Sequence, residues 1–202
     1  MPEPPSPPNP ENEAAIALMN RVREGDERAF GWLYAQHHRG VQNFFYALTR
    51  DSQAAYDLCQ DTFVRIWKTR QRYAATGSFK AYLFTFGRHI WLEHRRRAIR
   101  EQRLGTPAAL DDYIESLLAN AATAPGELAS RSESRDVLAA ALEELPEDQR
   151  IVFSLRYIQG LDLDEIARVM DCPVNTVRSR KLAALRKLRS LLQAYRTEGA
   201  VK

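Results

Sequence analysis

Apolar residues recur every three or four positions along most of the chain, the spacing that gathers side chains on one face of an α-helix. The helices predicted in this way cover residues 14–23, 27–48, 54–73, 79–103, 131–145, 147–158, 162–170 and 173–192. The strict alternation of apolar and polar residues that marks a half-buried strand occurs nowhere in the sequence. We therefore expect an all-α fold.

A stretch without helical periodicity divides the chain into two parts. Residues 105–130 are rich in alanine, with prolines, a glycine and scattered acidic residues, a composition typical of linkers. We therefore expect two small helical domains, 13–104 and 131–197, joined by a flexible linker. The segment 1–12 is rich in proline and acidic, and we expect it to be a disordered tail.

Residues 160–192 predict two helices joined by a tight turn, which is a helix-turn-helix. Asp162 can cap the first helix, with Glu165 three positions later as its capping-box partner. The segment 170–173 should end this helix, because its final proline disfavours the α conformation in the preceding residue. The apolar residues expected to face inward from the second helix are Val177, Leu182, Leu185 and Leu188.

The outward face of the second helix carries charge of one sign. No acidic residue lies between Cys172 and Thr197, whereas seven residues there are basic: Arg178, Arg180, Lys181, Arg186, Lys187, Arg189 and Arg196. Such a stripe on the second helix of this pair is the electrostatic footprint of a phosphate backbone. Arginine can also read guanine in the major groove, and asparagine can read adenine. The alternative is a coiled-coil or solvated basic helix.

The helix predicted over residues 79–103 changes character along its length. Its first half holds five aromatic residues: Phe79, Tyr82, Phe84, Phe86 and Trp91. Its second half is basic, with Arg95, Arg96, Arg97, Arg100 and Arg103 against only two glutamates. Aromatic rings and cations together suit single-stranded nucleic acid, whose bases stack while its phosphates attract charge. We expect Leu83, Phe84 and Phe86 to belong to the core instead.

The helix predicted over residues 54–73 has an acidic side. Ala55, Leu58, Thr62 and Ile66 recur at helical spacing and should face inward, which leaves an acidic and polar surface of Asp57, Gln60 and Asp61 on the other side.

The composition of the chain limits the classes of protein it can be. None of its apolar runs approaches the roughly 18 residues that span a bilayer, and its first residues lack the basic and apolar regions of a signal peptide. We therefore expect a cytoplasmic protein without membrane insertion, in which Cys59 and Cys172 are reduced thiols. The net charge of +3 is small, so its distribution matters more than its total.

An enzyme is the first alternative to a nucleic-acid-binding protein. Its best candidates are His89, Glu93, His94 and Cys59, but the two histidines are five residues apart, off the spacing that places two ligands on one helical face. We therefore expect no catalytic site, no metal and no cofactor.

The motifs and their order resemble the extracytoplasmic-function branch of the bacterial sigma-70 family. The motifs are DLCQDTFVRIW at 57–67, SFKAYLFTFGRHIWLEHRRR at 78–97, and LPEDQRIVFSLRYIQGLDLDEIARVMDCPVNTVRSRKLAALRKL at 145–188. The resemblance implies an alternative sigma factor that binds core RNA polymerase, directs it to specific promoters and helps open the DNA. The turn of the helix-turn-helix often holds glycine in this family. Asp171 stands there in this chain, a residue that tolerates a left-handed conformation.

The resemblance also implies a role for three sets of residues. Those expected to bind the clamp helices of core polymerase are Tyr56, Asp57, Gln60, Asp61, Phe63 and Trp67. Those expected to melt and hold the minus-ten element are Phe79, Lys80, Tyr82, Arg88, His89, Arg95 and Arg96, together with the loop 72–79. Those expected to read the minus-thirty-five element are Asn175, Thr176, Arg178, Ser179, Arg180 and Lys181.

Two further interpretations concern partners. An autonomous transcription regulator would use the helix-turn-helix on duplex operators, but it would need neither the aromatic and basic helix nor the acidic one. Sequestration by an inhibitory anti-sigma factor is compatible with the sigma-factor interpretation and does not compete with it.

Overall fold

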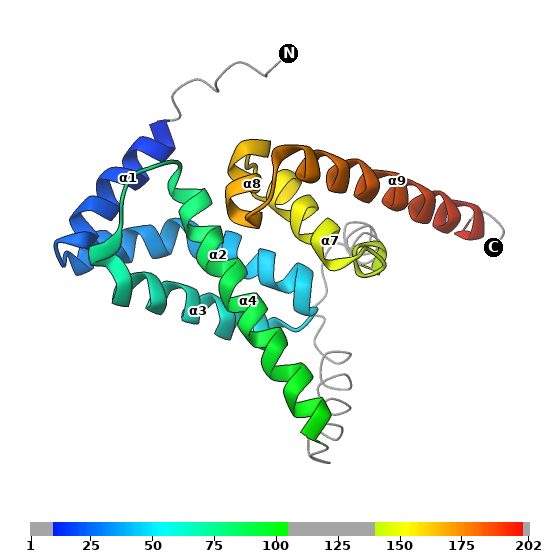
Figure 1. The fold of residues 1–202 in the computed structure, drawn as a ribbon, viewed down its shortest axis with the longest axis horizontal. Helices are drawn as coiled ribbons and strands as arrows, with labels where there is room; N and C mark the ends of the chain where they lie inside the picture. Colours follow the sequence, from blue (N-terminus) through cyan, green and yellow to red (C-terminus); the bar gives the residue numbers. More distant parts are fainter. Residues whose placement is uncertain (1–9, 105–139, 200–202) are drawn as a thin grey trace.

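The computed structural model describes residues 10–104 and 140–199, and all regular structure in these two ranges is helical (Figure 1). The all-α prediction is confirmed. The elements are α1 (Pro10–Arg23), α2 (Glu27–Thr49), α3 (Ser52–Thr69), the 3-10 turn η1 (Arg70–Arg72), α4 (Phe79–Leu104), α7 (Glu147–Phe153), the π-helical turn η2 (Ser154–Ile158), α8 (Leu163–Met170) and α9 (Val174–Gly199). The predicted linker 105–130 lies outside the described residues.

Local signals set the ends of the first helices. Asp26 caps α2, with its Oδ1 accepting a hydrogen bond from the Ala29 backbone N–H at 3.0 Å. Arg50 ends α2 in the left-handed conformation at φ 58°. Asp51 then caps α3 by accepting from Gln53 and Ala54. Because a capped helix end leaves fewer backbone donors unpaired, these side chains fix where the chain turns.

The aromatic half of α4 forms the centre of the core. Phe84 packs edge-on against Phe44 of α2 with ring centroids 5.3 Å apart, and Phe44 packs in the same way against Phe45. Phe44, Phe45 and Leu83 are almost completely buried. The expectation that Leu83 and Phe84 belong to the core is confirmed, whereas Phe86 is only partly buried.

The first helix begins earlier than predicted. It starts at Pro10, not at residue 14, because proline is favoured in the first helical turn and Glu11 and Glu13 suit the positive end of the helix dipole. Asn12 of this turn accepts a hydrogen bond from the Phe79 backbone N–H at 2.8 Å, which ties the start of α1 to the start of α4. The boundary predicted for the tail at residue 12 thus falls inside α1, and residues 1–9 lie outside the described part of the chain.

The helix-turn-helix forms as predicted. Asp162 and Glu165 make both hydrogen bonds of a capping box at the start of α8, at 2.7 and 2.8 Å. Asp171 ends α8 in the left-handed conformation at φ 49°. The helix α9 follows and extends away from the rest of the molecule toward the C-terminus (Figure 1).

Three residues predicted to face inward are exposed. Ile158 follows the π-helical turn η2, and the extra residue in that turn rotates it out of the stripe formed by Ile151, Val152 and Leu155. Leu182 and Leu185 are 50% and 37% exposed because α9 is anchored by Val177, Ala184 and Leu188 instead. At about 100° per residue, Leu182 and Leu185 lie well away from that stripe.

The two halves of the described structure pack against each other. The helix α8 contacts α4, and α7 and η2 contact α2. A continuous cluster of buried apolar residues includes Phe44 and Phe84 from the first half and Leu155, Ile166 and Val177 from the second. A smaller cluster of Ala141, Leu142, Leu145, Ala184 and Leu188 holds α9 to the segment before α7.

We predict that Asp162→Ala lowers the free energy of unfolding by about 1 kcal/mol, because it removes the side-chain oxygen that caps α8. Denaturant unfolding followed by circular dichroism would measure the loss. Asp164→Ala is the matched control, an exposed acid in the same first turn. It should cost only about 0.3 kcal/mol through the helix dipole. Equal losses in the two variants would contradict the capping role.

Candidate nucleic-acid and polymerase interfaces

The outer face of α3 is acidic with apolar members. Tyr56, Asp57, Gln60 and Asp61 are all exposed, as predicted, and Tyr56 is 42% exposed. Val64 lies one helical turn beyond Gln60 and is 47% exposed. These five residues, named the α3 face below, combine carboxylates with apolar surface. Val64 was missed because a single apolar residue in a helical pattern is normally assigned to the core.

Two residues predicted for this face belong to the core or its edge. Phe63 is buried, with its ring edge-on to Tyr34 at 4.9 Å and to Phe30 at 6.2 Å. Phe63 is therefore corrected to a packing residue, because its position on α3 turns it toward α2. Trp67 is partly buried against Phe30, and the Arg70 guanidinium lies 4.3 Å from its ring centroid.

A pocket lies where the loop after η1 meets α4. Its volume is about 160 Å³. The residues that line it are Tyr73, Ala74, Thr76, Gly77, Ser78, Ala81, Tyr82, Thr85 and Arg168. Tyr73 and Tyr82 pack edge-on at 4.9 Å, and burial raises the pKa of both phenols. This loop pocket therefore offers uncharged aromatic and hydroxyl groups beside one guanidinium. The structure adds Tyr73 and Arg168 to the residues found from sequence.

The residues predicted for the minus-ten element do not all lie on one surface. Phe79 is buried, with its ring 5.1 Å from that of His37, so it is corrected to a core residue that fixes the start of α4. Lys80 and Tyr82 are partly buried, and His89, Arg95 and Arg96 are exposed. Arg88 is partly buried and its Nε has no hydrogen-bond partner within the described residues.

Two ion pairs order the basic part of α4. Arg65 of α3 donates two hydrogen bonds to the Glu93 carboxylate, at 2.7 and 2.8 Å, and this pairing lowers the pKa of Glu93. Arg95 pairs with Glu147 at the start of α7 at 2.6 Å. The side chains of both pairs are partly exposed, so their value is mainly geometric, in fixing the direction of α4's charges.

The predicted reading residues do share one helix end. Asn175, Arg178 and Ser179 are exposed on the first turns of α9, and Thr176, Arg180 and Lys181 are partly exposed. Arg178 donates to the Asn175 side chain at 3.0 Å. Arg180 is held inward by Asp148 at 2.5 Å and contacts the Cys172 sulfur at 3.6 Å. The exposed part of this surface, Asn175, Arg178 and Ser179, is named the reading face below.

The two cysteines are free thiols, as expected. Cys59 is buried in α3, and burial raises its pKa to about 12. Within the residues that the structure describes, no group of three His, Cys, Asp or Glu side chains is arranged to hold a metal ion. Among the described helices, none has the length and hydropathy needed to cross a membrane.

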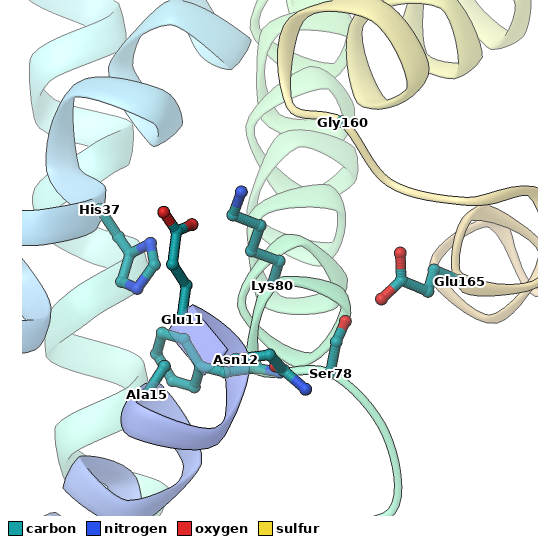
Figure 2. A pocket seen from close by; sticks show the side chains of 9 residues that line it. Glu11, Asn12, Ala15, His37, Ser78, Lys80, Gly160 and Glu165 are labelled. Carbon is teal, nitrogen blue, oxygen red and sulfur yellow. The ribbon is translucent and has the colours of Figure 1, made fainter. Parts of the chain in front are cut away.

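A small cavity of about 70 Å³ lies between α1, α2, α4 and the segment before α8. Figure 2 shows the Glu11 carboxylate between the His37 ring and the Lys80 ammonium group, with Glu165 on the other side. Burial, and then the nearby Lys80, lowers the pKa of His37 to about 4. The Nε2 atom of His37 has no hydrogen-bond partner among the described side chains.

These features define an all-helical protein with a basic helix-turn-helix and a second, aromatic and basic surface. The "Sigma-70 region 2" family profile matches residues 33–101, and the "Sigma-70, region 4" profile matches residues 135–188. The first match includes α3, the loop pocket and most of α4. The second includes α7, α8 and the reading face.

Curated relatives and solved structures agree with these matches. The ECF RNA polymerase sigma factor SigX of Bacillus subtilis is 29% identical over 172 residues, 83% of this chain and 87% of the relative. The RNA polymerase sigma-H factor of Pseudomonas aeruginosa is 28% identical over 180 residues, 87% and 92% of the two chains. The structure of CnrH in complex with the cytosolic domain of CnrY superposes with a TM-score of 0.63 at 25% identity, covering 90% of this chain and 98% of CnrH. The sigma factor RpoE of Bartonella quintana, in complex with the anti-sigma factor NepR, has the same fold, with a TM-score of 0.64 at 22% identity over 81% of this chain and 96% of RpoE.

The chain belongs to the sigma-70 family, in its extracytoplasmic-function branch, and is an alternative sigma factor that directs RNA polymerase to promoters. An autonomous regulator is set aside, because both sigma regions are present in their usual order.

We predict that His37 makes the protein less stable in mild acid. Its folded pKa is below that of the unfolded chain. The stability from neutral His37 is therefore complete above about pH 6.5 and is lost as the pH falls toward 4. Between pH 7.5 and 5 the free energy of unfolding should fall by about 2 kcal/mol on this account.

Denaturant unfolding at several pH values would measure this slope in the wild type and in His37→Gln. The variant should lose most of the slope, whereas the same substitution at the exposed His89 should keep it. An unchanged slope in His37→Gln would place the pH dependence elsewhere.

Proposed function

We propose that the α3 face binds core RNA polymerase. Its side chains are exposed, acidic and partly apolar, with Tyr56 and Val64 flanking the carboxylates. Exposed aromatic and aliphatic groups among charges are typical of the centre of a protein interface. The backing of α3 by Phe63 and Ile66 supports this role, because a rigid helix loses little entropy on binding.

The loop pocket and the basic side of α4 take the minus-ten element as single-stranded DNA in this proposal. The aromatic lining of the pocket from Tyr73 and Tyr82 suits an unstacked base. Lys80, Arg88, His89, Arg95 and Arg96 lie along the same helix, where cations can follow the phosphates. The ion pair of Arg65 with Glu93 supports this assignment, because it orients α4 against α3.

The reading face takes the minus-thirty-five element as duplex DNA. Arg178 and Asn175 stand on the first turns of α9, where the second helix of a helix-turn-helix meets base edges. Lys181 and the later arginines of α9 supply phosphate contacts. Phosphate contacts position the protein and base contacts specify the sequence, so the two sets of side chains do different work.

The division of labour follows the predicted domains. Residues 13–104 carry polymerase binding and melting, residues 131–197 carry duplex reading, and the chain itself makes or breaks no covalent bond. An anti-sigma factor is a further partner in this proposal. The complexes of CnrH with CnrY and of RpoE with NepR support it, since two solved structures of the same fold hold such a partner or the cytosolic domain of another protein.

We expect Asp61→Ala and Gln60→Ala to weaken binding to core RNA polymerase about tenfold each, the effect of losing about 1.4 kcal/mol at an interface. Run-off transcription from the DNA upstream of its own gene, with titrated protein, would measure this. Glu24→Ala is the matched control, since it removes one exposed carboxylate outside α3. The assignment of the α3 face fails if all three variants initiate equally well.

We expect Arg178→Ala to weaken duplex binding by about 1 to 3 kcal/mol and to relax specificity at one base pair. Competition binding against single-base variants of the site, at fixed salt, would measure both effects. Arg186→Ala removes an exposed cation further along α9. It should weaken binding less, and equally for all sequences. A uniform loss in Arg178→Ala would make Arg178 a phosphate contact instead.

A further inference from the structure

The second half of the chain forms part of the loop pocket. The helix α8 packs against α4 (Figure 1), and its Arg168 side chain lines the pocket together with Tyr73 and Tyr82. A Cβ atom added to Gly77 would lie 3.5 Å from Nη2 of Arg168. The guanidinium therefore lies at van der Waals distance from the loop that would have to receive a base.

Two cations proposed to bind DNA are also engaged within the molecule. Lys80 Nζ donates to the Gln159 carbonyl at 3.5 Å, and Arg95 pairs with Glu147 at 2.6 Å. Both partners belong to the second half of the chain. A phosphate at either cation would have to replace a carbonyl or a carboxylate already there.

Polar contacts with α2 hold the second half in this position. Gln159 Nε2 donates to the Gly40 carbonyl at 2.9 Å, and Arg50 pairs with Glu143 at 2.7 Å. Beneath these contacts lies the apolar cluster shared by the two halves. The arrangement is thus a closed state with its own packing.

The other two surfaces remain open in this closed state. The α3 face is exposed, and so are Asn175, Arg178 and Ser179 of the reading face. The contacts between the halves therefore cover the single-strand surface selectively.

We propose that the second half of the chain is an intramolecular inhibitor of single-strand binding, with Arg168 covering the loop pocket and Glu147 and Gln159 occupying two of the DNA-binding cations. The proposal rests on the proposed function of the loop pocket. Polymerase and duplex DNA reach their surfaces in the closed state, whereas single-stranded DNA binds only after α8 leaves α4. The apparent single-strand affinity of the free protein is then reduced by the fraction of molecules that are open.

A wedge variant tests the closed state in the full chain. A Cβ on Gly40 would lie 2.8 Å from Oε1 of Gln159, so Gly40→Gln should displace Gln159 and open the contact. Gly31→Gln is the matched control in the same helix, because a Cβ there meets nothing within 4 Å. The probes are fluorescein-labelled oligonucleotides tiled over the DNA upstream of its own gene, as non-template single strands and as duplexes.

Fluorescence anisotropy without polymerase should give Gly40→Gln about tenfold higher affinity for single strands than the wild type or Gly31→Gln, the change expected when one molecule in ten is open. Duplex affinity should be equal in all three proteins. Equal single-strand affinity in Gly40→Gln and Gly31→Gln would overturn the proposal, and so would undetectable single-strand binding by Gly40→Gln.

A locked variant tests the same contact in the opposite direction. Gly40→Cys and Gln159→Cys, in a Cys172→Ser background, can be joined by a short bis-maleimide. Cys59 should not react, because burial holds its pKa near 12. The joined protein should still bind core RNA polymerase but lose run-off transcription, and the unjoined protein should retain it.

The two sets of results separate two different failures. Transcription by the joined protein at the unjoined level would overturn the inhibitor. Failure of the wild type to initiate with core polymerase would instead overturn the proposed function, and the anisotropy comparison would still report on the closed state.

Discussion

Burial of the aromatic half of α4 is the interaction on which the other features depend. Phe79, Leu83 and Phe84 are nearly inaccessible, and they pack among α1, α2 and α3. Because one half of the helix is anchored in this way, its basic half has to project from the bundle. The same anchoring sets the loop before Phe79, which the Asn12 side chain also holds. The position of the loop pocket and the direction of the arginines thus follow from one packing decision.

The three functional surfaces differ in chemistry as their targets do. The α3 face is acidic and partly apolar, the loop pocket is aromatic with cations nearby, and the reading face is basic and polar. A small net charge of +3 conceals this separation. Segregating the charges lets one short chain present a protein-binding surface that does not attract nucleic acid and two surfaces that do.

The closed arrangement connects these surfaces energetically. A shared apolar cluster stabilises contact between the halves, while a few partly exposed polar contacts set its register. Exposed ion pairs contribute little individually, so the contact can be strong enough to form and weak enough to exchange for DNA. Partners that bind the open surfaces act on this equilibrium only as far as they prefer one of its states.

The sequence by itself determined the all-α class, the caps at Asp26, Asp51 and Asp162, and the helix-turn-helix. These depend on hydrogen bonds and periodicity within a few residues. It also identified the exposed acids of α3 and the basic start of α9, because charge patterns are local. The burial of Phe63 and Phe79 was decided only by the tertiary structure, and so was the exposure of Ile158, Leu182 and Leu185. Whether a large apolar residue at a helix edge is covered depends on which helix arrives beside it, and the place of Arg168 in the loop pocket depends on how α8 meets α4.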